Sequence, residues 1–175
     1  MVPGSTISNG LDLTAEAFLA EHLLGRVAVA YTDAHYTQTV TYGDFVTVRA
    51  GDAVGLGAPW SVVASLERDF PFRADLTGSL RVEDAFHSHN SRSFYEENPQ
   101  SNYYVPGWHP DPSTNILNAR ATLRWSHFDV AGFVTNTLNS QPTLGVAIAP
   151  SGAVRGSWAQ TLTPRTVGVS GTWRF

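Results

Sequence analysis

The last ten residues of the chain alternate strictly between two kinds of side chain. One set is apolar or small, and its members are Val167, Val169, Gly171, Trp173 and Phe175. The other set is polar or small, and its members are Thr166, Gly168, Ser170, Thr172 and Arg174. A period of two residues is typical of a β-strand that shows different environments to its two faces. The pattern predicts an amphipathic strand that reaches the last residue.

A longer alternation of the same kind covers residues 72–86. Its apolar or small positions, interrupted by Asp84, are Phe72, Ala74, Leu76, Gly78, Leu80, Val82 and Phe86. Fourteen steps of about 3.3 Å, tilted by about 45°, rise roughly 33 Å, which is close to the thickness of a bilayer core. Aromatic residues stand at both ends, as they do at membrane interfaces. We therefore expect a membrane-crossing strand with Leu76, Leu80 and Val82 facing lipid; the alternative is a long strand of a soluble β-sandwich.

Other segments alternate in a similar way, which predicts strands at residues 25–37, 60–70, 115–126 and 128–138. Residues 11–25 are ambiguous. Leu11, Leu13, Ala15, Ala17 and Leu19 alternate with polar residues as in a strand. The same segment also contains a helical apolar stripe, with Thr14 as an N-cap and Gly25 as a C-cap. The local pattern leaves helix and strand equally open for residues 11–24.

The connections between these segments alternate between short and long. Short ones are expected near residues 21–25, 69–71 and 126–127, and long ones at about residues 37–59, 88–113 and 139–159. Long loops are uncommon in compact domains unless they are functional. An up-and-down meander with tight turns at one end and long loops at the other is typical of bacterial outer-membrane barrels.

Composition narrows the function classes. The net charge of −4 and the isoelectric point near 5.8 argue against nucleic acid as a partner. All eleven basic residues are arginine. There is no cysteine, so thiolate metal sites and cysteine nucleophiles are excluded. No apolar stretch is long enough for a transmembrane helix, and the first ten residues lack the features of a signal peptide. No catalytic motif for a nucleophile, a zinc protease or a phosphate loop is present, so we expect no enzyme activity.

Five stretches in order resemble the C-terminal barrel strands of TonB-dependent outer-membrane receptors. They are SNGLDLTAEAFL, YTDAHYT, APWSVVASLERDFPF, DPSTNILNARATLRWSHFDVAGFVTNTLN and QTLTPRTVGVSGTWRF. The resemblance implies an all-β fold: an antiparallel up-and-down transmembrane β-barrel segment with short periplasmic turns and long extracellular loops. It favours a strand at residues 11–19, which makes about seven strands, the last third of a 22-stranded barrel with a plugged lumen.

The resemblance also implies a function and a cellular location. Receptors of this family reside in the Gram-negative outer membrane and take up scarce nutrients such as siderophore iron, cobalamin or sugars, coupled to TonB. Residues 1–175 would then be the C-terminal portion of the barrel domain, without the plug domain and the N-terminal barrel strands. Seven strands are fewer than the smallest single-chain bacterial barrel and leave two unpaired edges in lipid. We therefore expect a fragment that is not active alone and whose partners are the bilayer and the remaining barrel and plug.

The last strand matches the family's signal for the barrel-assembly machinery. That signal has a terminal aromatic residue, a second aromatic two residues earlier, and apolar residues at alternate positions before it. Phe175, Trp173, Val169 and Val167 match these positions, and Gly171 is small where a bulkier residue is usual. The resemblance thus implies that the assembly machinery is a partner of this chain.

The long loop after residue 87 carries the candidate ligand-binding residues Tyr95, Tyr103, Tyr104 and Trp108 among polar side chains. Such mixtures line sugar and small-ligand sites, and by resemblance an outer loop helps to capture substrate. The alternative is a loop that packs on itself. His87, His89 and Glu83 would share one strand face, but polar side chains are expected there in a barrel lumen, so we predict no metal and no cofactor. Residues 136–142 stand where relatives often have an Asn-Leu-x-Asp turn, and we assign them no role.

Two further functions remain open at this point. A soluble carbohydrate-binding β-sandwich fits the tryptophan and tyrosine content. A small porin-like barrel assembled from several copies fits the strand pattern, although an odd number of strands makes closure awkward.

Overall fold

The computed structural model describes residues 4–55, 57–101, 104, 106, 111–147 and 158–174, and within these ranges the chain is all-β. The described residues form eleven strands and one 3-10 helix, η1 (Tyr95–Glu97). The strands are β1 (Thr6–Ala20), β2 (Leu23–Tyr36), β3 (Val40–Tyr42), β4 (Phe45–Val48), β5 (Trp60–Arg73), β6 (Leu76–His87), β7 (Thr114–Trp125), β8 (Phe128–Thr135), β9 (Thr143–Ala147), β10 (Trp158–Thr161) and β11 (Thr166–Trp173).

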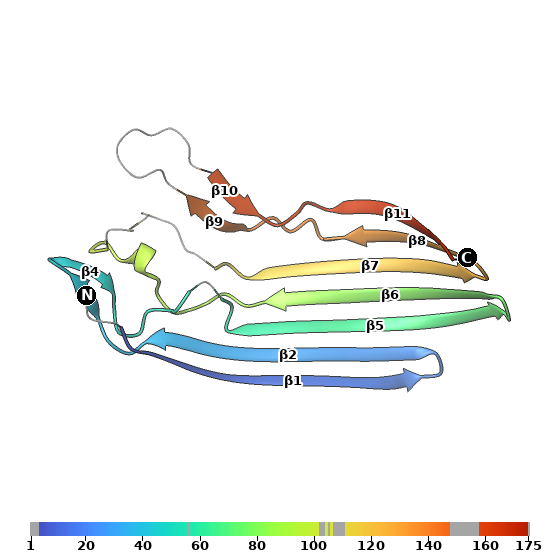
Figure 1. Ribbon diagram of the computed structural model, residues 1–175, viewed down its shortest axis with the longest axis horizontal. Coiled ribbons are helices and arrows are strands. Elements are labelled where there is room, and N and C mark those ends of the chain that lie inside the picture. Colours follow the sequence, from blue (N-terminus) through green and yellow to red (C-terminus); the bar gives the residue numbers. More distant parts are fainter. Residues whose placement is uncertain are drawn as a thin grey trace.

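Seven of the described strands form one antiparallel sheet in the order β1-β2-β5-β6-β7-β8-β11 (Figure 1). Each strand pairs with the next one along the chain, except that the hairpins β3–β4 and β9–β10 are inserted into two of the long connections. Two-residue turns join β1 to β2, β5 to β6 and β7 to β8 at one end of the sheet, and the long connections lie at the other end. The predicted seven-strand meander, with its alternation of short and long connections, is confirmed.

Residues 6–20 form a strand, which resolves the local ambiguity between helix and strand. Fourteen residues of β1 pair with β2, from Thr6 opposite Tyr36 to Ala20 opposite Leu23. Backbone pairing with a neighbouring strand, which no local pattern encodes, outweighs the helical stripe in this segment.

The predicted boundary between the third and fourth long strands is wrong. The turn consists of Ala74 and Asp75 rather than residues 69–71, so Phe72 and Arg73 still belong to β5. A register shift between Pro71 and Arg73 lets β5 continue past the proline. The alternation in residues 72–86 therefore crosses a tight turn, and β6 has 12 residues instead of the expected 15.

One face of the large sheet is apolar across all seven strands. Strand register places Leu13, Val29, Val62 and Phe86 in one row across β1, β2, β5 and β6. It places Val82, Ala119, Val134 and Val167 in another row across β6, β7, β8 and β11. The predicted lipid-facing residues Leu76, Leu80 and Val82 lie on this face. Val167, Val169 and Trp173 lie on the same face. We call it the apolar face.

Aromatic residues bound the apolar face at both ends. At the loop end, Tyr31 and Trp60 are opposite one another on β2 and β5, with ring centroids 4.7 Å apart. At the turn end, Phe128 and Trp173 have ring centroids 4.6 Å apart, and Trp125 pairs with Phe128. Phe72 follows Trp60 by twelve positions on β5. This spacing corresponds to about 40 Å along the strand and to about 28 Å in height at a tilt of about 45°.

The opposite face, called the polar face below, carries ion pairs between neighbouring strands. Arg26 on β2 contacts Glu16 on β1 at 2.5 Å. Arg81 on β6 contacts Glu67 on β5 at 3.2 Å and Glu83 on its own strand at 2.6 Å. Arg174 pairs with Asp129 beyond the end of β11. Among the described strand residues of the sheet, Phe18 and Val63 are the exposed large hydrophobics on this face.

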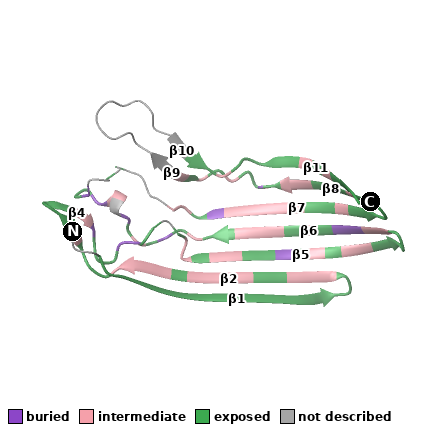
Figure 2. Cartoon of the chain, in the orientation of Figure 1, coloured by how far each residue is buried: buried purple, intermediate pink, exposed green. Residues whose placement is uncertain are grey.

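The buried hydrophobic residues lie mostly in the loops and not in the sheet. Among the described residues they are Val48, Ala53, Phe94 and Ala131. Figure 2 shows the strands largely in the colours of exposed and intermediate residues. Many large apolar side chains of the apolar face are open to the surroundings, for example Leu11 at 65 %, Val169 at 78 % and Trp173 at 63 % exposure. The sheet therefore has an extensive apolar surface that the described part of the chain does not cover.

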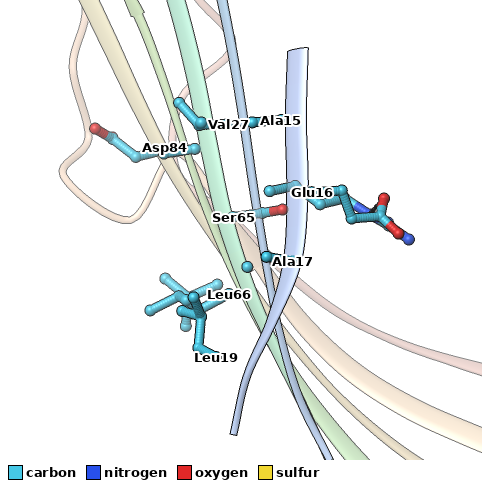
Figure 3. Close-up of a pocket in the computed structure, with 12 residues that line it drawn as sticks. Ala15, Glu16, Ala17, Leu19, Val27, Ser65, Leu66 and Asp84 are labelled. Atoms are coloured by element: carbon cyan, nitrogen blue, oxygen red, sulfur yellow. Dashed lines mark hydrogen bonds and ion pairs between the residues drawn. The ribbon is translucent and has the colours of Figure 1, made fainter.

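A shallow groove of about 450 Å³ crosses the apolar face over β1, β2, β5 and β6. Its floor is made by the small residues Ala15, Ala17, Gly25 and Ala64. In Figure 3, Asp84, Val27 and Ala15 lie toward one end of it and Leu19 and Leu66 toward the other. Leu19 covers Gly25, where an added Cβ atom would lie 2.8 Å from the leucine Cδ1 atom.

Candidate functional site

A pocket of about 420 Å³ lies where the long loops meet the loop end of the sheet. Two adjacent strands supply its wall, because the C-terminal part of β2 lies beside the first residue of β5. The segment that follows β6 closes it. The lining residues are Tyr31, Asp33, Pro59, Trp60, Ser88, His89, Asn90, Ser91 and Arg92. We call this cavity the loop-end pocket.

An ion pair between Arg92 and Asp33 fixes the loop to the sheet. The Arg92 Nε atom donates to Asp33 Oδ1 at 2.5 Å, and a terminal guanidinium nitrogen donates to Asp33 Oδ2 at 2.7 Å. This bidentate geometry is the strong form of an arginine–carboxylate contact. The hydrogen bonding that Arg92 donates to the Asp33 carboxylate raises the pKa of Arg92, against a smaller opposing effect of burial. The two residues are 59 positions apart, so the contact joins distant segments.

Two more contacts hold the loops against each other. The Asn90 side-chain amide donates to the Gly57 carbonyl at 3.0 Å, and the Ala53 amide donates to the Ser93 carbonyl at 2.9 Å. Ala53 and Phe94 are each only 2 % exposed. The loops therefore form a small packed cap of their own over the loop end of the sheet.

We expect Arg92→Gln to loosen this cap without unfolding the sheet. Loss of both charge-assisted hydrogen bonds should speed exchange of the Ala53 amide about 10- to 100-fold, because that amide is protected only while the loops are docked. Hydrogen-exchange mass spectrometry of the segment containing Ala53 measures this. Arg49→Gln is the matched control, since Arg49 contacts only the exposed Gln100 side chain among its described side-chain partners. Equal exchange rates in both variants would contradict the assigned role of Arg92.

Polar groups on the loop side of the pocket are held in defined positions. The His89 Nδ1 atom lies 3.1 Å from the Asp111 carbonyl oxygen, which leaves Nε2 for other partners. The Ser88 hydroxyl accepts a hydrogen bond from the Trp60 amide at 3.1 Å. Burial raises the pKa of Asp111.

Of the predicted ligand-binding aromatic residues, Tyr104 is not among the described residues that line the loop-end pocket. Tyr95 begins η1, and Tyr104 is 39 % exposed. Tyr103 and Trp108 lie outside the described residues. Among the described residues, the aromatic side chains that line the pocket are Tyr31 and Trp60, which come from the strands, while the predicted loop contributes residues 88–92. The sequence signal for this pair is that each aromatic residue occupies a position on the apolar side of an alternating strand, and that Trp60 is the first residue of its strand.

The predicted assembly-signal residues take the expected strand positions as far as they are described. Val167, Val169 and Trp173 lie on the apolar face of β11, opposite Val134, Gly132 and Phe128 of β8. Phe175 lies outside the described residues.

A second hollow, of about 350 Å³, opens on the polar face between β6, β7 and β8. Arg120 lies here with its guanidinium carbon 5.9 Å from the Phe133 ring centroid, and it donates to the Ser170 hydroxyl at 3.1 Å. The Phe133 ring covers Gly168, whose missing side chain makes room for it. The polar face thus combines ion pairs with a small amphipathic hollow.

The predicted histidine pair does not share a strand face. His87 ends β6 on the polar face and lies 2.8 Å from the Ser61 hydroxyl, whereas His89 lies beyond the strand and lines the loop-end pocket. In the part of the chain that the structure describes, no three histidine, aspartate or glutamate side chains are grouped to hold a metal ion. No helix among the described residues has the length and apolar character needed to cross a membrane.

Comparison of this chain with protein-family models, with curated proteins and with solved structures finds no match.

Proposed function

We propose that this chain forms part of the wall of an outer-membrane β-barrel, the C-terminal part of a TonB-dependent receptor that takes up a scarce nutrient. In this proposal the tight turns face the periplasm, the long loops face the outside, and the chain is no enzyme and needs no cofactor. The bilayer, the barrel-assembly machinery, and the remaining barrel and plug with TonB coupling are its partners. The transported substrate is a siderophore-bound metal, a cobalamin, a sugar or a similar compound.

The observation that carries the proposal is the apolar face with aromatic residues at both ends. A soluble domain would have to bury such a surface, because apolar area costs about 25 cal/mol per Å² in contact with water. In a bilayer the same surface can contact hydrocarbon, so it need not be buried within the protein. The height of about 28 Å between the two aromatic ends is close to the apolar band of about 25 Å on outer-membrane barrels. The apolar face is thus suited to contact lipid, with Tyr31, Trp60, Trp125 and Trp173 at the two interfaces.

The polar face supports a water-filled or plugged lumen on the other side. In transmembrane barrels polar residues point inward and apolar residues outward, in alternation along each strand. The ion pairs of Arg26, Arg81 and Arg174 lie on that inward side. The face would accommodate water or a plug domain, and lipid would be excluded from it by the cost of desolvating the charges.

The two unpaired edges of the sheet support the proposal that further strands complete the barrel. Within the described residues, β1 pairs only with β2, and β11 pairs only with β8. In hydrocarbon each unsatisfied backbone group costs several kcal/mol, so both edges need partner strands. The proposal assigns these strands to the remaining barrel of the receptor.

Cell fractionation tests the proposal directly. An antibody against residues 88–101 should detect the protein in outer-membrane fractions of the source cells, in a band several times heavier than the chain's 19.0 kDa. The band should migrate faster when the sample is not boiled, because folded barrels resist detergent. A cytoplasmic protein as a control for fractionation must stay in the soluble fraction. Detection of the antigen only in the soluble fraction would refute the proposal.

The loop-end pocket favours a second candidate, a soluble carbohydrate-binding module. Its paired aromatic rings and polar side chains are common features of sugar sites. That candidate requires the purified chain to unfold cooperatively in buffer without detergent. A third candidate, a small barrel of several copies, requires stable oligomers in detergent with a defined conductance.

A further inference from the structure

We infer that the loop-end pocket and the groove on the apolar face together bind one amphiphile, a lipid with a carbohydrate headgroup. The inference rests on the proposed function, because it needs the apolar face to lie in a membrane. It assigns the pocket to a membrane lipid rather than to the transported substrate.

The first step is the side of the sheet on which the loop-end pocket opens. Its three strand residues Tyr31, Asp33 and Trp60 all belong to the apolar face by strand register. Residues of the polar face, such as Thr32 and Ser61, do not line it. A ligand in this pocket would therefore lie at the outer membrane surface, on the lipid side of the wall, and not at the mouth of the lumen.

The second step is the chemistry of the pocket. The rings of Tyr31 and Trp60 offer apolar faces at which a sugar ring can stack. The Arg92 charge is neutralised by its bidentate contact with Asp33, so the pocket is suited to a neutral group rather than to a simple anion. Ser88, Asn90 and the free Nε2 atom of His89 add hydrogen-bonding groups. Aromatic surface beside several neutral donors and acceptors favours a polyhydroxylated headgroup.

The third step is a path for the acyl chain. The residues next below Tyr31 and Trp60 on the apolar face are Val29 and Val62, and the row after that contains Val27 and Ala64. Those two residues line the groove, which continues toward Leu66 and Leu19 (Figure 3). The distance from Tyr31 to Val27 is about 13 Å along the strand, well within the length of an acyl chain. Headgroup pocket and apolar groove thus lie in line on one face.

Asp84 stands at the place where the headgroup and the acyl chain would join. It is paired with Ala64 and Leu117 on the apolar face, at the pocket side of the groove. A carboxylate on a lipid-facing surface is costly and therefore indicates a functional role. Here it can accept a hydrogen bond from a hydroxyl or amide of the lipid's linker region. A purely hydrocarbon occupant would leave this carboxylate without such a donor.

Spin-label measurements on the intact barrel protein that contains this chain, inserted in phosphatidylcholine vesicles, test the inference. The probes are digalactosyl diacylglycerol, phosphatidic acid and phosphatidylcholine, each labelled on the acyl chain. The fraction of each probe that is immobilised by the protein gives its relative association constant. We expect the galactolipid to associate about tenfold more strongly than phosphatidylcholine, and phosphatidic acid to show no such preference. Protease protection of the strands and far-ultraviolet circular dichroism, recorded on the same vesicles, report whether the chain is inserted.

Two tryptophan variants make the test specific. Trp60→Leu should abolish most of the galactolipid preference, because it removes half of the aromatic pair. Trp125→Leu is the matched control: Trp125 is on the same face at the turn end and is similarly exposed, at 52 % against 45 % for Trp60. This control should keep the preference. Both variants should insert as the unchanged chain does.

Each other outcome overturns the inference in a recognisable way. Equal preference for phosphatidic acid would show a phosphate site instead of a sugar site. Complete competition by millimolar free lactose would show that the pocket binds sugar without the acyl chain. Equal loss in both variants would show a general aromatic effect. Failure of this intact barrel protein to insert would refute the proposed function and this inference together, whereas an inserted protein without preference would refute only the inference.

Discussion

Replacement of Ala121 by arginine is expected to cost about 2–3 kcal/mol of folding free energy in a bilayer. Ala121 lies on the apolar face of β7 between Leu80 of β6 and Gly132 of β8. It is four residues from Trp125, so the new charge would lie about 13 Å along the strand from the turn-end aromatic residues. Leu80 is a less suitable position for the added arginine, because a charged side chain is already present beside it. Leu80 lies opposite Arg68, whose guanidinium is 5.4 Å from the Phe70 ring centroid.

Urea unfolding of the intact barrel protein that contains this chain, inserted in vesicles, measures this cost. Thr14→Arg is the control on the polar face, where Asp12 and Glu16 on the same strand and face offset the added charge. Its stability should change by less than about 0.5 kcal/mol. If the apolar face were exposed to water, arginine at the exposed position 121 would be tolerated equally well. Equal stabilities of the two variants would thus contradict lipid contact of the apolar face.

Replacement of Asn136 by alanine is expected to destabilise the connection between β8 and β11 by about 2–4 kcal/mol. The Asn136 side chain donates to the Ser140 and Thr163 carbonyls at 2.8 and 2.9 Å, and accepts from the Ser140 amide at 2.9 Å. Its φ angle of 49° lies in the left-handed region, where asparagine is better tolerated than alanine. The side chain is buried, at 4 % exposure, so water cannot replace the lost hydrogen bonds.

Two further variants separate the contributions of Asn136. Glycine tolerates the positive φ angle but cannot make the side-chain hydrogen bonds. Asn136→Gly should therefore recover about 1 kcal/mol of the lost stability. Asn139→Ala is the matched control, because Asn139 also has a positive φ angle but is exposed and its Oδ1 atom accepts from the Arg165 amide at 3.0 Å. Its cost should be about 1 kcal/mol. The free energy of unfolding of each variant is the quantity to measure. Equal losses of stability at positions 136 and 139 would contradict the central role of Asn136.

The position of Asn136 illustrates what local pattern does not contain. The sequence assigns no role to the segment after β8, because Leu138 and Asn139 depart from the Asn-Leu-x-Asp turn that relatives often have there. Its partner Thr163 is 27 residues away, and the hydrogen bond forms only when β8 and β11 are paired. The same holds for the loop-end pocket, where Arg92 meets Asp33 across 59 residues of chain.

Alternation by itself predicted six of the seven long strands and the residues on each of their faces, because the side-chain period of a strand is strictly two, and the short and long connections predicted their antiparallel order. It did not determine where one strand ends and the next begins at residues 72–76, since a two-residue turn can preserve the alternation of the flanking strands. Nor did it distinguish strand from helix at residues 11–24, where small apolar residues satisfy both periods. Pairing with β2, the docking of the long loops and the meeting of Tyr31, Trp60 and Arg92 were decided only by the tertiary structure. These contacts depend on register and on chain closure over long separations, which are properties of the assembled sheet and not of any segment.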